Sequence, residues 1–157
     1  MSELRVPTVA MVAGVTCLDG RTFHGRIFVP ASSSTHEGPM RAQEWMNAGG
    51  QFFPFLPDEA EAPIILNKKE VLVLSIESGL EHEEEAEVEA GQIDREVLAE
   101  CGTRQLTGHL HIDMPPHHQR VLDYLNRPEA FLALHDGPKL HLVQKHNITR
   151  VLDVGRA

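Results

Sequence analysis

The feature that most constrains the fold of this 157-residue chain is an internal repeat. "GRTFHGRIFV" at residues 20–29 aligns with "TRQLTGHLHI" at 103–112, and "RAQEWMN" at 41–47 aligns with "RVLDYLN" at 120–126. Two later pairs continue the alignment in the same order: Phe52 with Phe131, and Lys68 with Lys145. Because the order is preserved and the gaps are small, the repeat indicates duplication of a unit of about 65 residues, a size that can just form its own core.

The repeated unit is predicted to begin with two strands. In "VTCLDGRTFHGRIFV" the pair Asp19-Gly20 is typical of a hairpin with a type I′ turn, since both central positions of that turn need positive φ. The second strand alternates between two sets of side chains in both units, which places one set on a core face and the other opposite. Gly25 and Gly108 lie within this strand and indicate a bend or a close approach of neighbouring backbone.

A short helix and further strands are expected to complete each unit. In "PPHHQRVLDYLN" a proline suits the first turn of a helix, and Val121, Leu122 and Leu125 form an apolar stripe. We expect Asn47 and Asn126 to cap their helices, because asparagine tolerates the left-handed conformation. The sequence therefore predicts an all-β fold with one short helix per unit, as two tandem small barrels or bent antiparallel sheets with pseudo-twofold symmetry.

The distribution of charge sets the expected boundaries. The formal net charge is −9, and residues 77–100 carry ten acids and one base, so the rest of the chain is neutral. A block of like charges without apolar periodicity is typical of a solvated linker. We therefore expect a first β unit over residues 8–76, an acidic linker over 77–94, and a second β unit over 95–155.

The compartment is predicted from what the sequence lacks. It has no apolar run of membrane-spanning length, and its first residues lack the basic region and long apolar core of an export signal. Cys17 and Cys101 are then expected to be reduced thiols in a bacterial cytoplasmic protein.

Two stretches of the first unit resemble the Sm-like (LSm) family, a small bent five-stranded barrel: "DGRTFHG" at 19–25 and "EWMN" at 44–47. A final β-turn-β segment adds to the likeness. In that family an acidic residue and an asparagine help to bind uridine bases. The resemblance implies an RNA-binding role for four side chains: Glu44, Asn47, Asp123 and Asn126. The repeated layout also resembles small bacterial domains of unknown activity that share its strand–glycine–strand, "LN" and "F-x-x-L" pattern.

The histidines concentrate in the second unit, where seven of the ten lie in residues 101–157. His109 and His111 fall on one face of a strand, as two imidazoles that bind one metal must. "GHLH" followed by "LHDGPKLH" is similar to the cupin motifs, in which His-x-His and a third histidine hold a metal. That resemblance implies a divalent transition metal bound by His109, His111 and either His135 or His141. The alternative is a pair of surface or interface histidines, since the same alternation puts them opposite the core.

No strong catalytic motif is present in the sequence, which lacks Gly-x-Ser-x-Gly and a phosphate-binding glycine loop. We therefore expect a non-enzymatic binding or assembly module without a cofactor, whose sheet faces or open strand edges engage a protein partner or another copy of the chain. A metal-binding cupin-like protein and an Sm-like RNA-binding protein are the two alternatives. The neutral units offer no concentrated basic stripe for nucleic acid, and no membrane partner is expected.

Overall fold

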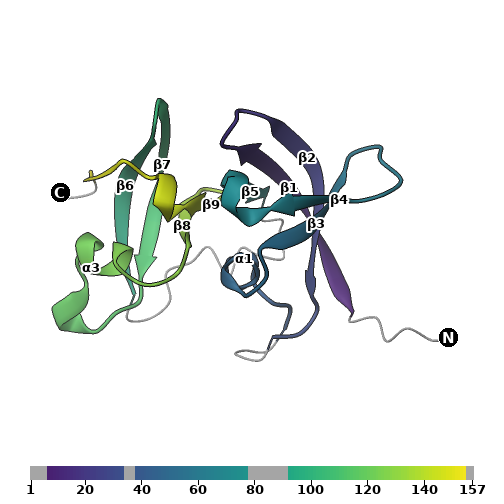
Figure 1. Cartoon of the computed structure of the whole chain (residues 1–157). Helices are drawn as coiled ribbons and strands as arrows, with labels where there is room; N and C mark the ends of the chain where they lie inside the picture. Colours follow the sequence, from purple (N-terminus) through teal and green to yellow (C-terminus); the bar gives the residue numbers. More distant parts are fainter. Residues whose placement is uncertain (1–6, 34–37, 78–91, 155–157) are drawn as a thin grey trace. The chain divides into compact units, whose positions relative to one another are not determined.

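The computed structural model describes residues 7–33, 38–77 and 92–154. The chain is mainly β-structure, as predicted, and it divides into two compact units, Met1–Ile76 and Glu77–Ala157 (Figure 1). None of the helices in these three ranges is long and apolar enough to cross a membrane.

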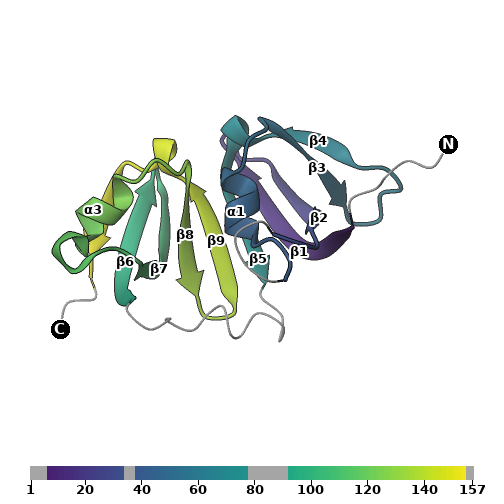
Figure 2. The same ribbon diagram turned by 90° about the horizontal axis from the view of Figure 1, so that it is seen from below.

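The first unit contains an antiparallel sheet with a short helix. Its described strands are β1 Thr8–Cys17, β2 Thr22–Pro30, β3 Phe52–Pro57, β4 Ile64–Asn67 and β5 Val71–Glu77. Helix α1 (Ala42–Asn47) lies between β2 and β3, and the 3-10 helix η1 (Lys68–Glu70) lies between β4 and β5. The strands are ordered β5-β1-β2-β3-β4, and each pairs antiparallel with its neighbour (Figure 2).

The second unit has the same succession of elements. Its described strands are β6 Ile93–Cys101, β7 Arg104–Ile112, β8 Phe131–Asp136, β9 Lys139–Gln144 and β10 Arg150–Asp153. Between β7 and β8 lie the 3-10 helix η3 (Pro116–His118) and helix α3 (Val121–Leu125), and η4 (Lys145–Asn147) precedes β10. The strand order β10-β6-β7-β8-β9 is that of the first unit when corresponding strands are compared.

The pairing registers of the two units correspond residue by residue. The aligned strand glycines stand opposite equivalent residues of the preceding strand, and the pairs of the third and fourth strands also match. Four cross-strand pairs show this: Gly25–Ala13 with Gly108–Val97, and Phe53–Leu66 with Leu132–Val143. The sequence alignment therefore pairs residues that occupy equivalent places in the two sheets.

Alternate residues of the strands form a core in each unit. The first core includes Val15, Ile27 and Phe55, and the second includes Val97, Leu110, Ile112 and Leu134. Each of these side chains is at most 1% exposed. The alternation predicted along β2 and β7 is confirmed, because the residues between the buried positions of these two strands are exposed or half-buried.

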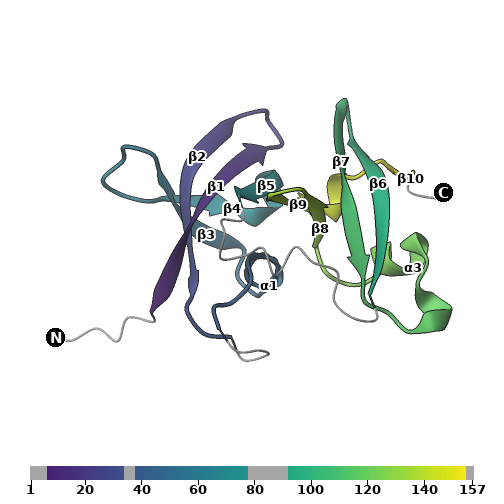
Figure 3. The same cartoon turned by 180° about the vertical axis from the view of Figure 1, so that it is seen from behind.

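The close approach predicted at the strand glycines is also confirmed. A Cβ at Gly25 would overlap the backbone carbonyl of Leu56 on β3. At Gly108 it would lie 2.9 Å from the Cβ of Leu134 on β8. Only glycine lets the two backbones come this near, so the hairpins β1–β2 and β6–β7 can each bend against the next strand (Figure 3).

The hairpin predicted at Asp19-Gly20 forms, but its turn type was predicted wrongly. Of the two residues only Gly20 has a positive φ, of 91°. Its N–H donates to the Cys17 carbonyl oxygen at 3.0 Å, and the Cys17 N–H donates to the Arg21 carbonyl oxygen at 2.8 Å. A single left-handed glycine at the end of a tight turn is typical of a longer hairpin loop, not of the two-residue type I′ turn.

The helix of the second unit begins later than predicted. Proline at position 116 starts the 3-10 helix η3, and α3 begins only at Val121, after Arg120 in an extended conformation. Leu122, expected in the apolar stripe, is 57% exposed, whereas Tyr124 is buried. A helix of five residues has little more than one turn, so it directs few side chains toward the core.

Strands occupy both ends of the predicted linker over residues 77–94. β5 continues to Glu77, and β6 begins at Ile93, which pairs with Ile112 at the end of β7. Composition marks the acidic segment but not the length of the hairpin that follows it. The rest of the predicted linker, residues 78–91, lies outside the described residues.

Candidate functional site

The structure brings three of the four predicted metal-binding histidines to one face of the second unit. His109 and His111 alternate along β7 with the buried Leu110 and Ile112. His135, near the end of β8, is the cross-strand partner of His109. Since directly opposed residues of antiparallel strands project to the same side, all three imidazoles lie on the face opposite the core.

The contacts within this cluster are not those of a metal site. The rings of His111 and His135 stack with centroids 3.9 Å apart and 6° between their planes. Parallel stacked rings do not direct their nitrogen lone pairs to one point, as a bound metal requires. His109 Nδ1 lies 3.0 Å from Oδ1 of Asp94 on β6. Among the described residues, no group of three or more His, Cys, Asp or Glu side chains could hold a metal ion.

His141 does not join the cluster. It stands opposite Leu134 on β8, whereas His135 stands opposite Leu140, so the register of β8 and β9 sends the two histidines to opposite faces. His141 Nε2 instead lies 3.1 Å from Oδ2 of Asp136.

Burial keeps the stacked rings neutral. It lowers the pKa of His135 to about 4, and the nearby His111 and His109 act in the same direction, while Asp94 opposes them. Burial also lowers the pKa of His111. Two neutral imidazoles can stack without charge repulsion, so these pKa shifts agree with the geometry of the pair.

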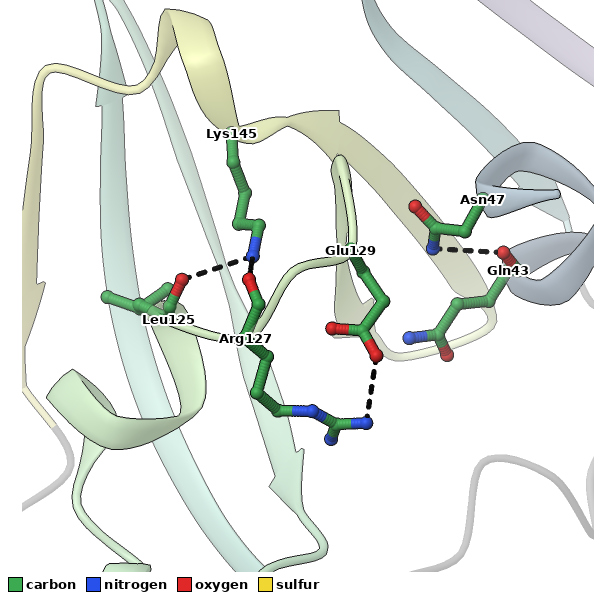
Figure 4. A network of polar contacts seen from close by, with 6 residues as sticks. All are labelled: Gln43, Asn47, Leu125, Arg127, Glu129 and Lys145. Atoms are coloured by element: carbon green, nitrogen blue, oxygen red, sulfur yellow. Dashed lines mark hydrogen bonds and ion pairs between the residues drawn. The ribbon is translucent and has the colours of Figure 1, made fainter. Parts of the chain in front are cut away.

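In the first unit, the residues that the Sm-like resemblance assigns to RNA binding contact their own unit. Glu44 Oε1 accepts from the backbone N–H of Arg41 at 3.3 Å, and Oε2 accepts from the hydroxyl of Ser33 at 3.1 Å. Asn47 Nδ2 donates to the Gln43 carbonyl oxygen at 3.0 Å (Figure 4). Both side chains thus stabilise α1 and its surroundings.

The corresponding residues of the second unit behave similarly. Asp123 accepts two hydrogen bonds from Arg120, at 2.9 Å from Nε and 3.1 Å from Nη2. Asn126 follows α3 with φ −83° and ψ 6°, and its backbone N–H donates to Leu122. Asn126 is therefore the C-cap of α3, as predicted, but not in the left-handed conformation. The prediction was wrong for Asn47, which is the last residue of α1 and is followed by Ala48 as the C-cap. Within the described ranges the only non-glycine residue with positive φ is Glu59.

A lysine that the sequence alignment paired, but to which it gave no role, contacts the end of each helix. In the second unit Lys145 Nζ donates to the carbonyl oxygens of Leu125 at 3.1 Å and Arg127 at 2.5 Å (Figure 4). These carbonyls lie at the C-terminus of α3, where no intrahelical partner is available. Burial lowers the pKa of the Lys145 ammonium group.

Lys68 makes similar contacts at the end of α1 in the first unit. Its Nζ donates to the carbonyl oxygens of Trp45 at 3.3 Å and Ala48 at 3.2 Å, at the end of α1. Burial lowers its pKa as well. The alignment of Lys68 with Lys145 was the sequence signal for these contacts. The sequence could not show the contacts themselves, because they depend on the packing of η1 and η4 against the helix ends.

Strand β4 forms an edge of the first unit's sheet. It pairs with β3 and has no second neighbour among the described strands. Ile65 on this strand is 73% exposed and stands opposite the exposed Pro54. Phe52, two residues before Pro54 on the same face, is 58% exposed. β4 thus presents an apolar edge that carries no charged residue.

No protein-family model, curated protein or solved structure matches the chain. Inference of its function therefore rests on the fold and on the surface features of its two units. Two such features stand out among the described residues: the apolar edge at β4 and the histidine cluster on β7 and β8.

Proposed function

We propose that the protein is a non-enzymatic binding and assembly module whose β4 edge takes up a strand from a protein partner or from another copy of the chain. The observation that carries this proposal is Ile65, 73% exposed on an uncharged edge strand. An unpaired edge presents N–H and C=O groups that an added strand can satisfy. Side chains of the added strand would also pack against Ile65 on its exposed face.

The contrast with β10 supports β4 as the binding edge. β10 forms an edge of the second unit's sheet, but it begins with Arg150 and ends with Asp153. Arg150 makes two hydrogen bonds with Glu100 on β6, from Nε at 3.0 Å and from Nη2 at 2.7 Å. Charged residues are the usual protection of a sheet edge against unwanted pairing. β10 has that protection and β4 does not.

The proposal includes an origin by duplication of an Sm-like unit. The shared strand order, the matching registers and the helix-capping lysines Lys68 and Lys145 support it. The proposal also includes a location in the bacterial cytoplasm. This location is supported by Cys17 and Cys101, which are free and buried at the equivalent ends of β1 and β6.

A library of random peptides displayed on phage can test the edge without knowledge of the partner. We expect the full chain to select extended peptides with alternating apolar residues, and these peptides to slow hydrogen exchange of the β4 amides. The variant Ile65→Lys should lose this selection, because a charge at that position protects an edge. Sedimentation velocity of the same variant tests whether self-association uses the edge.

Leu122→Lys is the matched control, since it places the same charge on an apolar side chain that is 57% exposed elsewhere. It should bind peptides like the natural chain. The proposal fails if the natural chain does not select peptides above the level of Ile65→Lys and if Ile65→Lys does not weaken self-association.

A further inference from the structure

Equivalent outer faces of the two units differ in chemical character. In the first unit, Ala10 stands opposite Phe28 and Val12 stands opposite Arg26. We call these four residues the β1–β2 face. Ala10, Val12 and Arg26 are exposed, Val12 at 61%, and Phe28 is half-buried. This face is apolar with one positive charge.

The corresponding positions of the second unit carry acids and histidines. Asp94 stands opposite His111, and Glu96 stands opposite His109. We call these four residues the β6–β7 face. It matches the β1–β2 face position by position, because Arg26 and His109 each follow the strand glycine directly. Arg26 thus occupies the position that corresponds to His109. Val12 occupies the position that corresponds to Glu96.

Arg26 and Glu96 give the two faces charges of opposite sign. The guanidinium of Arg26 makes no ion pair with any described residue, and the same holds for the carboxylate of Glu96. Next to Glu96, Leu98 stands opposite Leu152, which is 38% exposed, so the β6–β7 face also borders apolar surface. A surface with exposed apolar side chains and a positive charge is complementary to one with apolar surface and a negative charge.

We propose that the β1–β2 face of one copy docks on the β6–β7 face of a second copy, with Arg26 of one copy pairing with Glu96 of the other. This inference goes beyond the proposed function, since it assigns self-association to the sheet faces of the two units and not to the β4 edge. Burial of Val12 would supply apolar contact, and the charge pair would set the orientation. Because the two faces differ, the interface is heterologous, and further copies can add head to tail.

Charge reversal tests the interface in the full chain. Sedimentation velocity over a range of protein concentrations should show association of the natural chain. Arg26→Glu alone and Glu96→Arg alone should each weaken it by about tenfold or more. The double variant Arg26→Glu/Glu96→Arg should regain much of the loss, because the pair is restored with its charges exchanged. Thermal unfolding of each variant shows whether it folds, as expected for the exposed Arg26 and the half-buried Glu96.

Arg104→Glu is the matched control, because it makes the same change of charge at an exposed residue outside both faces. It should associate like the natural chain. The inference is overturned if the natural chain stays monomeric, if Arg26→Glu associates normally, or if the double variant behaves no better than the single ones. Peptide binding at β4 separates the two proposals. If it persists in a monomeric chain, the proposed function stands without this interface.

Discussion

The imidazole rings of His111 and His135 lie parallel, 3.9 Å apart between centroids, on two neighbouring strands of the second unit. The contact depends on both rings being neutral, because two protonated imidazoles at this distance would repel each other. Asp94 and Glu96 from β6 and His109 from β7 also lie on this face. The stack is therefore expected to weaken in acid.

The free energy of unfolding of the second unit should fall as the pH drops from about 7 to about 4. The folded unit protonates His135 only near a pKa of about 4, whereas the unfolded chain does so near 6.5, so the unfolded state binds more protons between these values. The effect of this residue is at most about 3 kcal/mol. Urea unfolding followed by circular dichroism at several pH values measures it.

His135→Phe provides the comparison, since it keeps a ring in the stack but cannot take up a proton. The pH dependence between 4 and 7 should shrink in this variant. His24→Phe, at an exposed histidine of the first unit, controls for the loss of a histidine in general. An unchanged pH dependence in His135→Phe would show that the stack is not the acid-sensitive element.

The same geometry predicts the response to a transition metal. A metal bound by His109, His111 and His135 would have to separate the stacked rings and displace Asp94 from His109. We therefore expect isothermal titration with Zn²⁺ at neutral pH to show no binding in the micromolar range. Micromolar binding that disappears in His109→Ala would contradict this and favour the cupin-like alternative.

The sequence could not show whether His135 or His141 lies near His109 and His111 on β7. Alternation along β7 was enough to place His109 and His111 opposite the core, because it depends on one strand alone. The choice between His135 and His141 depends on the register of β8 against β9 and of β7 against β8. That register follows from turns and from the approach at Gly108, where a one-residue slip would exchange the faces.

The helix ends show a similar limit. The alignment of Lys68 with Lys145 was visible in the sequence, and so was that of Asn47 with Asn126. Asparagine was the better candidate for a cap by local propensity. Asn126 does occupy the C-cap of α3, but the side-chain contacts to the helix ends come from the lysines. η1 and η4 bring Lys68 and Lys145 back to the helices across about 20 residues of chain, a contact that only the tertiary structure creates.

Removal of the capping lysine should destabilise its unit. Lys145→Met keeps much of the aliphatic side chain but leaves the carbonyls of Leu125 and Arg127 without their donor. Loss of a partner for half-buried polar groups costs about 1–3 kcal/mol. Urea unfolding should therefore show a lower free energy for Lys145→Met. Lys139→Met, at an exposed lysine on β9, should leave it nearly unchanged, and equal effects in both variants would contradict the capping role.

Alanine at the two strand glycines should destabilise the units to different degrees. At Gly25 the new Cβ would overlap the backbone of Leu56, which cannot move without displacing β3. At Gly108 the nearest atoms are the Cβ of Leu134 at 2.9 Å and the backbone oxygen of His135 at 3.2 Å, so the overlap is smaller than at Gly25. We expect a loss of about 3 kcal/mol for Gly25→Ala and about 1 kcal/mol for Gly108→Ala.

Gly49→Ala is the matched control for this pair, because its Cβ would have no heavy atom within 4 Å. Thermal and urea unfolding of the three variants give the comparison directly. The order Gly25→Ala, Gly108→Ala, Gly49→Ala, from the largest loss to the smallest, follows from steric overlap alone. If Gly108→Ala were the most damaging, the approach of β7 to β8 would have to be tighter than that of β2 to β3, contrary to the Cβ contacts at the two glycines.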